Sequence, residues 1–182
     1  MLSSNHAIEI LETNTKQWID EGLAEIPQIG AYPIEQLIRG LHGCNFYSWK
    51  ADDQSRADCD PAIIVKHKRN LDASNLMRNH FMEAIDHLTT STLEMDHSHD
   101  YSGKMLNSET IGQMLDRISV LTLKRAFVAS RLEETATRLA EQQIIRQLHY
   151  VTQCYDEFLL NLKKGRAYML AYKQYKMYKP DE

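Results

Sequence analysis

The sequence has few of the residues that form tight turns and disulfide scaffolds. Its 182 residues include 7 glycines, 4 prolines and 3 cysteines. So few turn-forming residues argue against an all-β chain. The cysteines, which are Cys44, Cys59 and Cys154, are odd in number and have no CxxC spacing. They therefore indicate reduced thiols rather than a disulfide framework or a zinc site.

Long apolar runs and a large excess of one charge are also absent from the sequence. No apolar run approaches the length of a membrane span, and Glu9 and Glu12 interrupt the apolar residues near the N-terminus, unlike a secretory signal. The formal charge of -4 argues against general nucleic-acid binding. We therefore expect a cytoplasmic protein with no membrane span, folded as a single helical domain over residues 1–182.

Apolar periodicity predicts an all-α bundle of five or six helices. Asp60 followed by Pro61 indicates one helix start, and Thr110 with Gln113 fits a capping box at another. Gly165 is typical of the residue that follows a helix C-terminus. Residues 89–107 have the composition of an internal loop. The helices are expected over residues 6–21, about 33–51, 61–88, two arms between 108 and 165, and 166–178.

The segment between Gly112 and Gly165 contains no glycine or proline. A single helix of that length is improbable in so small a domain, so we expect a long central helical hairpin. Its turn is predicted near Leu139–Gln143. The second arm has an apolar stripe at helical spacing, consisting of Ile144, Leu148, Val151, Tyr155, Phe158 and Leu162.

Polar residues interrupt two stripes that the periodicity predicts to face inward. The first stripe reads Ile64, Lys68, Leu71, Asn75, Arg78, Met82 and Ile85, with Asp72 placed to pair with Lys68. The second reads Glu109, Gln113, Asp116, Val120, Leu123 and Phe127, with Arg117 and Lys124 on a flanking face. Since buried charge is costly unless it is paired or liganded, these residues form either a structural network or the lining of a polar site.

Three sequence blocks resemble a bacterial family known as domain of unknown function 4254. The blocks are DPAIIVKHKRNLDASN, NSETIGQMLDRISVLTLK and GRAYMLAYKQYKMYKP, and the likeness extends over nearly the whole chain from about Ile34. The sequence departs from the family pattern in two places: Ile111 replaces a usual proline, and residues 125–128 replace a usual Ile-Tyr-His-Met. The residues that carry the likeness are Asp60, Pro61, Lys68, Arg69, Asp72, Asn75, Asp86, Asn107, Ser108, Glu109, Thr110, Asp116, Arg117, Ser119, Lys124, Gly165, Arg166, Tyr172, Lys173, Gln174, Lys176, Met177 and Tyr178.

The family brings no established activity, but the resemblance implies genes that lie near glycosyltransferases of envelope polysaccharide assembly. One hypothesis is therefore a protein that binds or processes a phosphorylated sugar or nucleotide-sugar. Asp72, Glu109 and Asp116 are its candidate catalytic residues or ligands for a divalent cation. The candidate ligand-binding residues are Lys68, Asn75, Arg78, Arg117, Lys124, Tyr172, Lys173 and Lys176.

The alternative hypothesis is a non-catalytic helical partner that docks onto a glycosyltransferase, its inward charges being structural. Long amphipathic helices with exposed tyrosines also make a homodimer reasonable. His80, Glu83 and His87 share a helix face, but the paired Glu-x-x-His motifs of a metal-binding bundle are missing, so no metal site is predicted. The six basic residues and no acid from Lys163 to Lys179 leave RNA as an improbable partner of a mildly acidic chain.

Overall fold

A computed structural model of the chain describes residues 2–22, 32–57, 60–95, 101–129, 135–171 and 173. In these ranges the chain forms five helices and a two-stranded parallel sheet with two residues in each strand, which confirms the all-α fold class. The elements are α1 (Ser4–Glu21), α2 (Ile34–Ala57), α3 (Pro61–Thr92), β1 (Met105–Leu106), α4 (Ile111–Ala129), α5 (Thr135–Lys163) and β2 (Ala167–Tyr168).

The predicted capping signals set three of the helix ends. Asp60 accepts a hydrogen bond from the backbone N–H of Ala62 at 2.8 Å, with Pro61 as the first residue of α3. Thr110 and Gln113 form a reciprocal capping box before α4. Gly165 has a φ of 65° after α5, and the N–H groups of residues 165 and 166 return to the carbonyls of residues 162 and 161. Local chemistry therefore defines where these helices stop and start.

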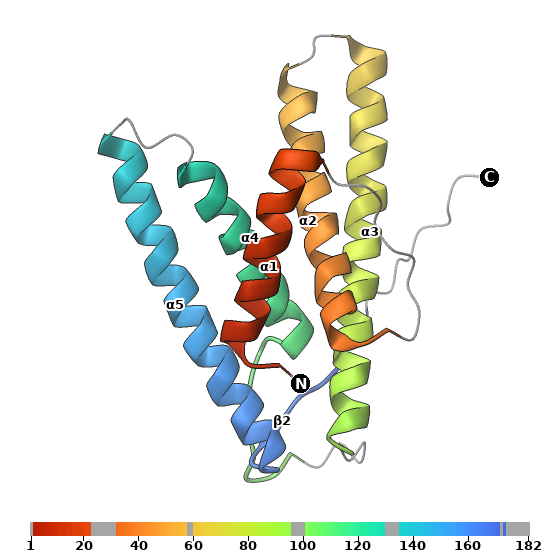
Figure 1. Cartoon of the computed structure of the whole chain (residues 1–182). Helices are drawn as coiled ribbons and strands as arrows, with labels where there is room; N and C mark the ends of the chain where they lie inside the picture. Colours follow the sequence, from red (N-terminus) through yellow and green to blue (C-terminus); the bar gives the residue numbers. More distant parts are fainter. Residues whose placement is uncertain are drawn as a thin grey trace, which may run out of the picture.

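The helices form two hairpins, with α1 packed between them (Figure 1). The α2–α3 pair makes the most extensive helix contact, α4 packs on both α3 and α5, and α1 contacts α2, α4 and α5. At one end of the molecule β1 pairs with β2, so that Met105 is opposite Ala167 and Leu106 is opposite Tyr168. This pairing connects the start of α4 to the end of α5. No helix in the described residues is long and apolar enough to cross a membrane.

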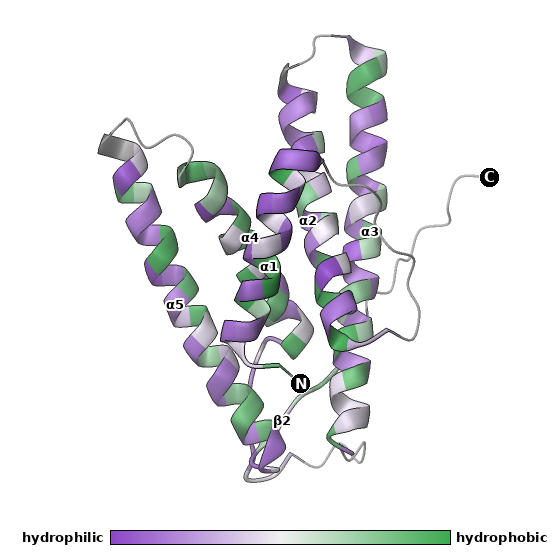
Figure 2. Ribbon diagram, viewed as in Figure 1, coloured by the Kyte–Doolittle hydropathy of each residue, from purple (hydrophilic) through white to green (hydrophobic). Residues whose placement is uncertain are grey.

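One large apolar core contains buried residues from all five helices. Hydrophobic and hydrophilic residues alternate along each helix (Figure 2). The predicted stripe on α5 is buried at every position from Ile144 to Leu162. Ala7, Leu11 and Trp18 are buried on α1 as expected. A smaller apolar cluster of Trp18, Phe46 and Leu123, with Phe127 packed against it, lies near the C-terminal end of α4.

Several expected boundaries are wrong. Residues 139–143 lie within α5, and the central hairpin instead turns between Ala129 and Thr135, where neither glycine nor proline marks it. Residues 89–92, expected in a loop, form the last turn of α3, and β1 lies within the rest of that loop. The helix expected at 166–178 is absent over 166–171, where the backbone forms β2 and its flanks. The rest of it, apart from residue 173, lies outside the described residues.

The stripe on α3 faces inward over only half its length. Met82 and Ile85 are buried, but Ile64 and Lys68 are exposed because the α2–α3 hairpin continues past α4, which covers this face lower on α3. Amphipathic spacing indicates which residues share a face and leaves open whether a neighbouring helix extends far enough to cover it.

Gly112 allows α4 to approach α3 closely. Its N–H donates to Oδ1 of buried Asp86 at 2.8 Å, and a Cβ at residue 112 would lie 2.5 Å from the carbonyl oxygen of Met82. A side chain here would therefore force the two helices apart.

Gly112→Ala should lower the free energy of unfolding by about 1–3 kcal/mol, as overpacking of a close contact does. Urea denaturation followed by circular dichroism measures this change. If α3 could give way, alanine would instead stabilise the helix by up to about 1 kcal/mol. A more stable variant would therefore contradict the close approach.

Candidate functional site

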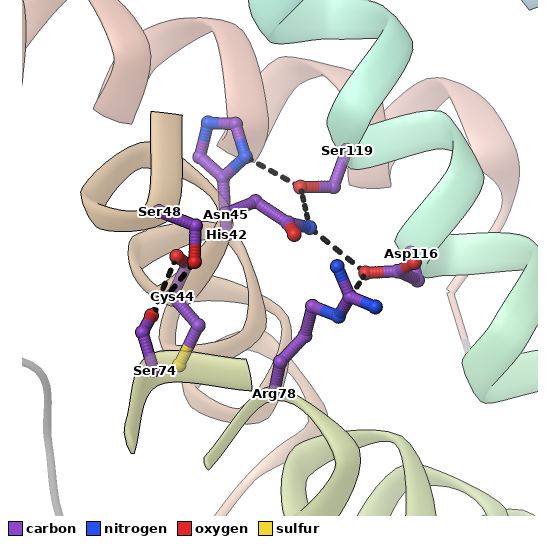
Figure 3. A network of polar contacts seen from close by, with 8 residues as sticks. All are labelled: His42, Cys44, Asn45, Ser48, Ser74, Arg78, Asp116 and Ser119. Carbon is purple, nitrogen blue, oxygen red and sulfur yellow. Dashed lines mark hydrogen bonds and ion pairs between the residues drawn. The ribbon is translucent and has the colours of Figure 1, made fainter. Parts of the chain in front are cut away.

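A chain of buried polar side chains connects four helices through the centre of the bundle. It includes Thr15 from α1, His42 and Asn45 from α2, and Ser119 and Asp116 from α4. Arg78 reaches the same place from α3 (Figure 3). These residues meet because each occupies a position where its own helix faces the core.

The hydrogen bonds of this chain run in one direction. The Thr15 hydroxyl donates to the carbonyl of Leu11 at 2.8 Å, so it must accept from Nε2 of His42, which lies 2.8 Å away. Burial lowers the pKa of His42 to about 3, so the ring is neutral and its Nδ1 accepts from the Ser119 hydroxyl at 2.8 Å. Asn45 then donates to Ser119 at 2.9 Å. Every proton in the chain has an acceptor.

Asp116 ends the chain and is its acidic member. The Asn45 amide, which also donates to Ser119, donates to Oδ1 of Asp116 at 2.9 Å. The same oxygen lies 3.7 Å from Nε of Arg78. That Nε is buried and makes no hydrogen bond within the described residues. Burial raises the pKa of Asp116, while Arg78 and the Asn45 hydrogen bond act to lower it. Asp116 and Arg78 therefore hold each other in place across the α3–α4 contact.

Asp116 also lines a groove between α4 and α5, with a volume of about 400 Å³. The α4 wall carries Arg117 and Lys124, whose side chains are exposed. The other residues that line the groove are Val120, Leu121, Gln147, Tyr150 and Val151. Oδ1 of Asp116 faces the buried chain, whereas Oδ2 makes no hydrogen bond within the described residues. One carboxylate thus belongs to both the core network and the groove.

Two serines and a thiol lie beside the network on the α2–α3 contact (Figure 3). Ser48 donates to Ser74, and Ser74 donates to the carbonyl of Cys44 at 2.9 Å. Burial raises the pKa of the Cys44 thiol to about 12. Since the thiolate is the nucleophilic form, Cys44 acts as a packing residue at neutral pH.

The structure brings some of the predicted site residues together and separates others. Glu109, just before α4, pairs with Arg117 at 2.8 Å beside the groove. Lys68 and Asp72 form their expected pair at 3.1 Å, but both are exposed, and Lys68 lies about 15 Å along α3 from Arg78.

Among the other predicted residues, those that the structure describes take no part in the network. Asn75 is half-buried and makes no hydrogen bond with described residues. Lys173 is exposed, and Tyr172 and Lys176 lie outside the described residues. Within those residues, no three His, Cys, Asp or Glu side chains are grouped to hold a metal ion.

Sequence reasoning missed the middle of the network, which consists of His42, Asn45 and Thr15. The signal was present on α2, where His42 and Asn45 continue the inward spacing of Ile38 and Leu41. The polar stripes that the sequence predicts lie on α3 and on the segment that includes α4. Ser119 contributed to the family likeness but was not identified as a contact.

The chain belongs to the family described as Protein of unknown function (DUF4254), whose profile matches residues 35–170. The match begins with α2 and ends just after β2, so it includes every residue of the polar network except Thr15. Comparisons with curated proteins and with solved structures gave no match.

The depressed pKa of His42 makes folding stability depend on pH. The ring stays neutral in the folded protein down to about pH 3 but takes up a proton near pH 6.5 when unfolded. Stability should therefore fall as the pH is lowered through this window, by up to about 1.4 kcal/mol per pH unit from this group. The raised pKa of Asp116 acts in the opposite direction, so the wild type must be compared with a His42 variant.

His42→Gln keeps a donor for Thr15 and cannot titrate. We expect it to be less stable than wild type at pH 7 and to have a shallower loss of stability between pH 6 and pH 4, as measured by urea denaturation at each pH. His149→Gln, at an exposed position, is the control and should keep the wild-type slope. Equal slopes for His42→Gln and wild type would contradict a neutral buried ring.

Proposed function

We propose that the protein binds a small phosphorylated ligand with a ring, namely a sugar phosphate or a nucleotide-sugar, in the groove between α4 and α5. The observation that carries this proposal is that a fixed carboxylate and two exposed cations share one wall of the groove. Such a wall offers both an acceptor for sugar hydroxyls and partners for phosphate.

The two cations are spaced for an extended anionic ligand. Arg117 and Lys124 are seven residues apart on α4, which places them on one face about 10 Å apart along the helix. Lys124 makes no ion pair within the described residues, and Arg117 has only the exposed pair with Glu109. An exposed pair of this kind is weak, so a phosphate can displace it.

Asp116 would receive the sugar. Its Oδ1 is held by Asn45 and Arg78, so the carboxylate cannot turn away when a ligand arrives, and Oδ2 stays available for a hydroxyl. A carboxylate beside a bound phosphate is also the usual way in which Mg²⁺ is held with a substrate. Asp116 is therefore the residue to which we assign hydroxyl binding, with the divalent cation as an arm of the test.

The opposite wall supplies a surface for stacking. Tyr150 on α5 is 68% exposed although it lines the groove, and Gln147 lies one turn before it. An aromatic face covers a sugar or base ring with little loss of side-chain entropy. In the setting that the family resemblance implies, the ligand class would be the activated sugars used in bacterial envelope polysaccharide synthesis.

Lys124→Ala should weaken binding about ten-fold, equivalent to about 1.4 kcal/mol, with the fold unchanged. Isothermal titration calorimetry would measure affinity for UDP-glucose, GDP-mannose and glucose 1-phosphate, each with Mg²⁺ and with EDTA. Arg146→Ala removes an exposed cation of α5 outside the groove and is the matched control.

Asp116→Asn gives a second measurement. It keeps the shape of the side chain and should lose affinity for the sugar-containing ligands more than for inorganic phosphate. Binding that is the same in Lys124→Ala and Arg146→Ala would exclude this groove. No binding by any of these ligands would favour the alternative of a non-catalytic partner of a glycosyltransferase, in which Asp116 serves the fold alone.

A further inference from the structure

The two-stranded sheet at one end of the molecule turns one face away from the core. Along the segment that includes β2, burial alternates from residue to residue, as in an extended strand. Ala167 and Met169 are buried in the apolar core. Arg166, Tyr168 and Leu170 alternate with them, and of these three the first and last are exposed and the tyrosine is half-buried. These three side chains therefore share the outer face of the segment.

The strand register extends this outer face to β1. Leu106 is opposite Tyr168, and residues that are opposite each other on neighbouring strands point to the same side of a sheet. Leu106 is 59% exposed and Leu170 is 66% exposed. Tyr101, which is 53% exposed, has its ring centroid 5.8 Å from that of Tyr168. Two leucines and two tyrosines thus form an outward surface, the sheet-end patch, consisting of Tyr101, Leu106, Tyr168 and Leu170.

The two segments that form the sheet-end patch carry cations and no acid. Residues 101–108 and 158–173 contain no Asp or Glu, although the whole chain has a formal charge of -4. Asp96 and Asp100 precede the first segment and lie outside the described residues. The five cations make no ion pair with another described residue, and all but half-buried Lys104 are exposed. They are Lys104, Lys163, Lys164, Arg166 and Lys173.

We propose that the sheet-end patch binds the surface of an anionic lipid bilayer. In this arrangement Leu106 and Leu170 enter the boundary between headgroups and acyl chains, and the five cations contact lipid phosphates. Tyrosine has an apolar ring and a polar hydroxyl, which suit the same boundary. The inference concerns attachment to one side of a bilayer and is independent of the α4–α5 groove.

A bilayer fits this surface better than a nucleic acid does. RNA would use the tyrosines for stacking and the cations for its backbone, and it would leave the two leucines exposed to water. A bilayer accepts all three kinds of side chain, because long basic side chains reach headgroups while their apolar neighbours leave water. The sheet also lies at one end of the bundle, where a flat surface can approach it (Figure 1).

Co-sedimentation of the full chain with lipid vesicles tests the proposal. We expect wild type to bind vesicles of equimolar phosphatidylcholine and phosphatidylglycerol at least ten-fold more tightly than vesicles of phosphatidylcholine alone. Because exposed charges are screened by salt, added sodium chloride should weaken this binding. Circular dichroism establishes that each variant is folded.

Two pairs of variants test the assignment to this patch. Leu170→Asp should weaken binding at least ten-fold, whereas Leu139→Asp, which adds the same charge at a 63% exposed leucine of α5, should bind as wild type does. Arg166→Glu should weaken binding in the same way. Its control is Arg146→Glu, at an exposed position on α5 outside the patch.

A fluorescent label tests whether the patch enters the bilayer. Cys44 is buried, so in a background with Cys59→Ser and Cys154→Ser an environment-sensitive thiol dye would label only an introduced cysteine. The dye on Leu170→Cys should shift its emission to shorter wavelength with the anionic vesicles, and the dye on Leu139→Cys should not.

Three results would overturn the proposal. The first is a wild type that does not bind the anionic vesicles. The second is binding that Leu170→Asp and Leu139→Asp weaken equally. The third is binding of a poly-uridine oligonucleotide, but not of vesicles, that Arg166→Glu abolishes, which would assign the surface to nucleic acid.

Discussion

The buried hydrogen-bond chain through His42 is the constraint on which the helix arrangement depends. An apolar core alone tolerates sliding of one helix along another, because hydrophobic contact has no direction. Here Thr15, His42, Asn45 and Ser119 must each find a donor or acceptor, and an unsatisfied one would cost about 1–3 kcal/mol. The register of α1, α2 and α4 is therefore defined by polar groups within an otherwise apolar interior.

The same chain explains how an acidic residue can lie so close to the core. Asn45 and Arg78 approach Oδ1 of Asp116, while Oδ2 makes no hydrogen bond within the described residues, and the residue also lines the groove. A structural network and a binding site are usually offered as competing explanations of an inward charge. In the function that we propose, one carboxylate would serve both, because the network that holds it also fixes the geometry that a ligand in the groove would meet.

Much of the fold could be predicted from local sequence. The N-cap at Asp60, the capping box at Thr110 and the apolar stripe on α5 all depend on residues close in the chain. The turn after Ala129 could not be located, because no glycine or proline lies there. The strand at Ala167 depends on pairing with Met105, far away in the sequence. Local propensity cannot identify a pairing partner so distant in the sequence.

The site was only partly predictable for the same reason. Asp116, Arg117 and Lys124 share one helix, so their spacing is visible in the sequence. Asp72 and Lys68 have equally suggestive spacing, but they lie on a part of α3 that extends past α4 and are exposed. Asn45 lies far from Asp116 in the chain, and only the packing of α2 on α4 brings them to 2.9 Å.

The short pairing of β1 with β2 has a mechanical consequence for the groove. β1 precedes the start of α4, and β2 follows the end of α5. Their pairing therefore attaches the two walls of the groove to each other at that end. The chain itself joins the same two helices at the other end, between Ala129 and Thr135, so the walls of the groove are connected at both ends. A wider groove would therefore require the helices to bend, or the side chains between them to repack, because neither end is free to open.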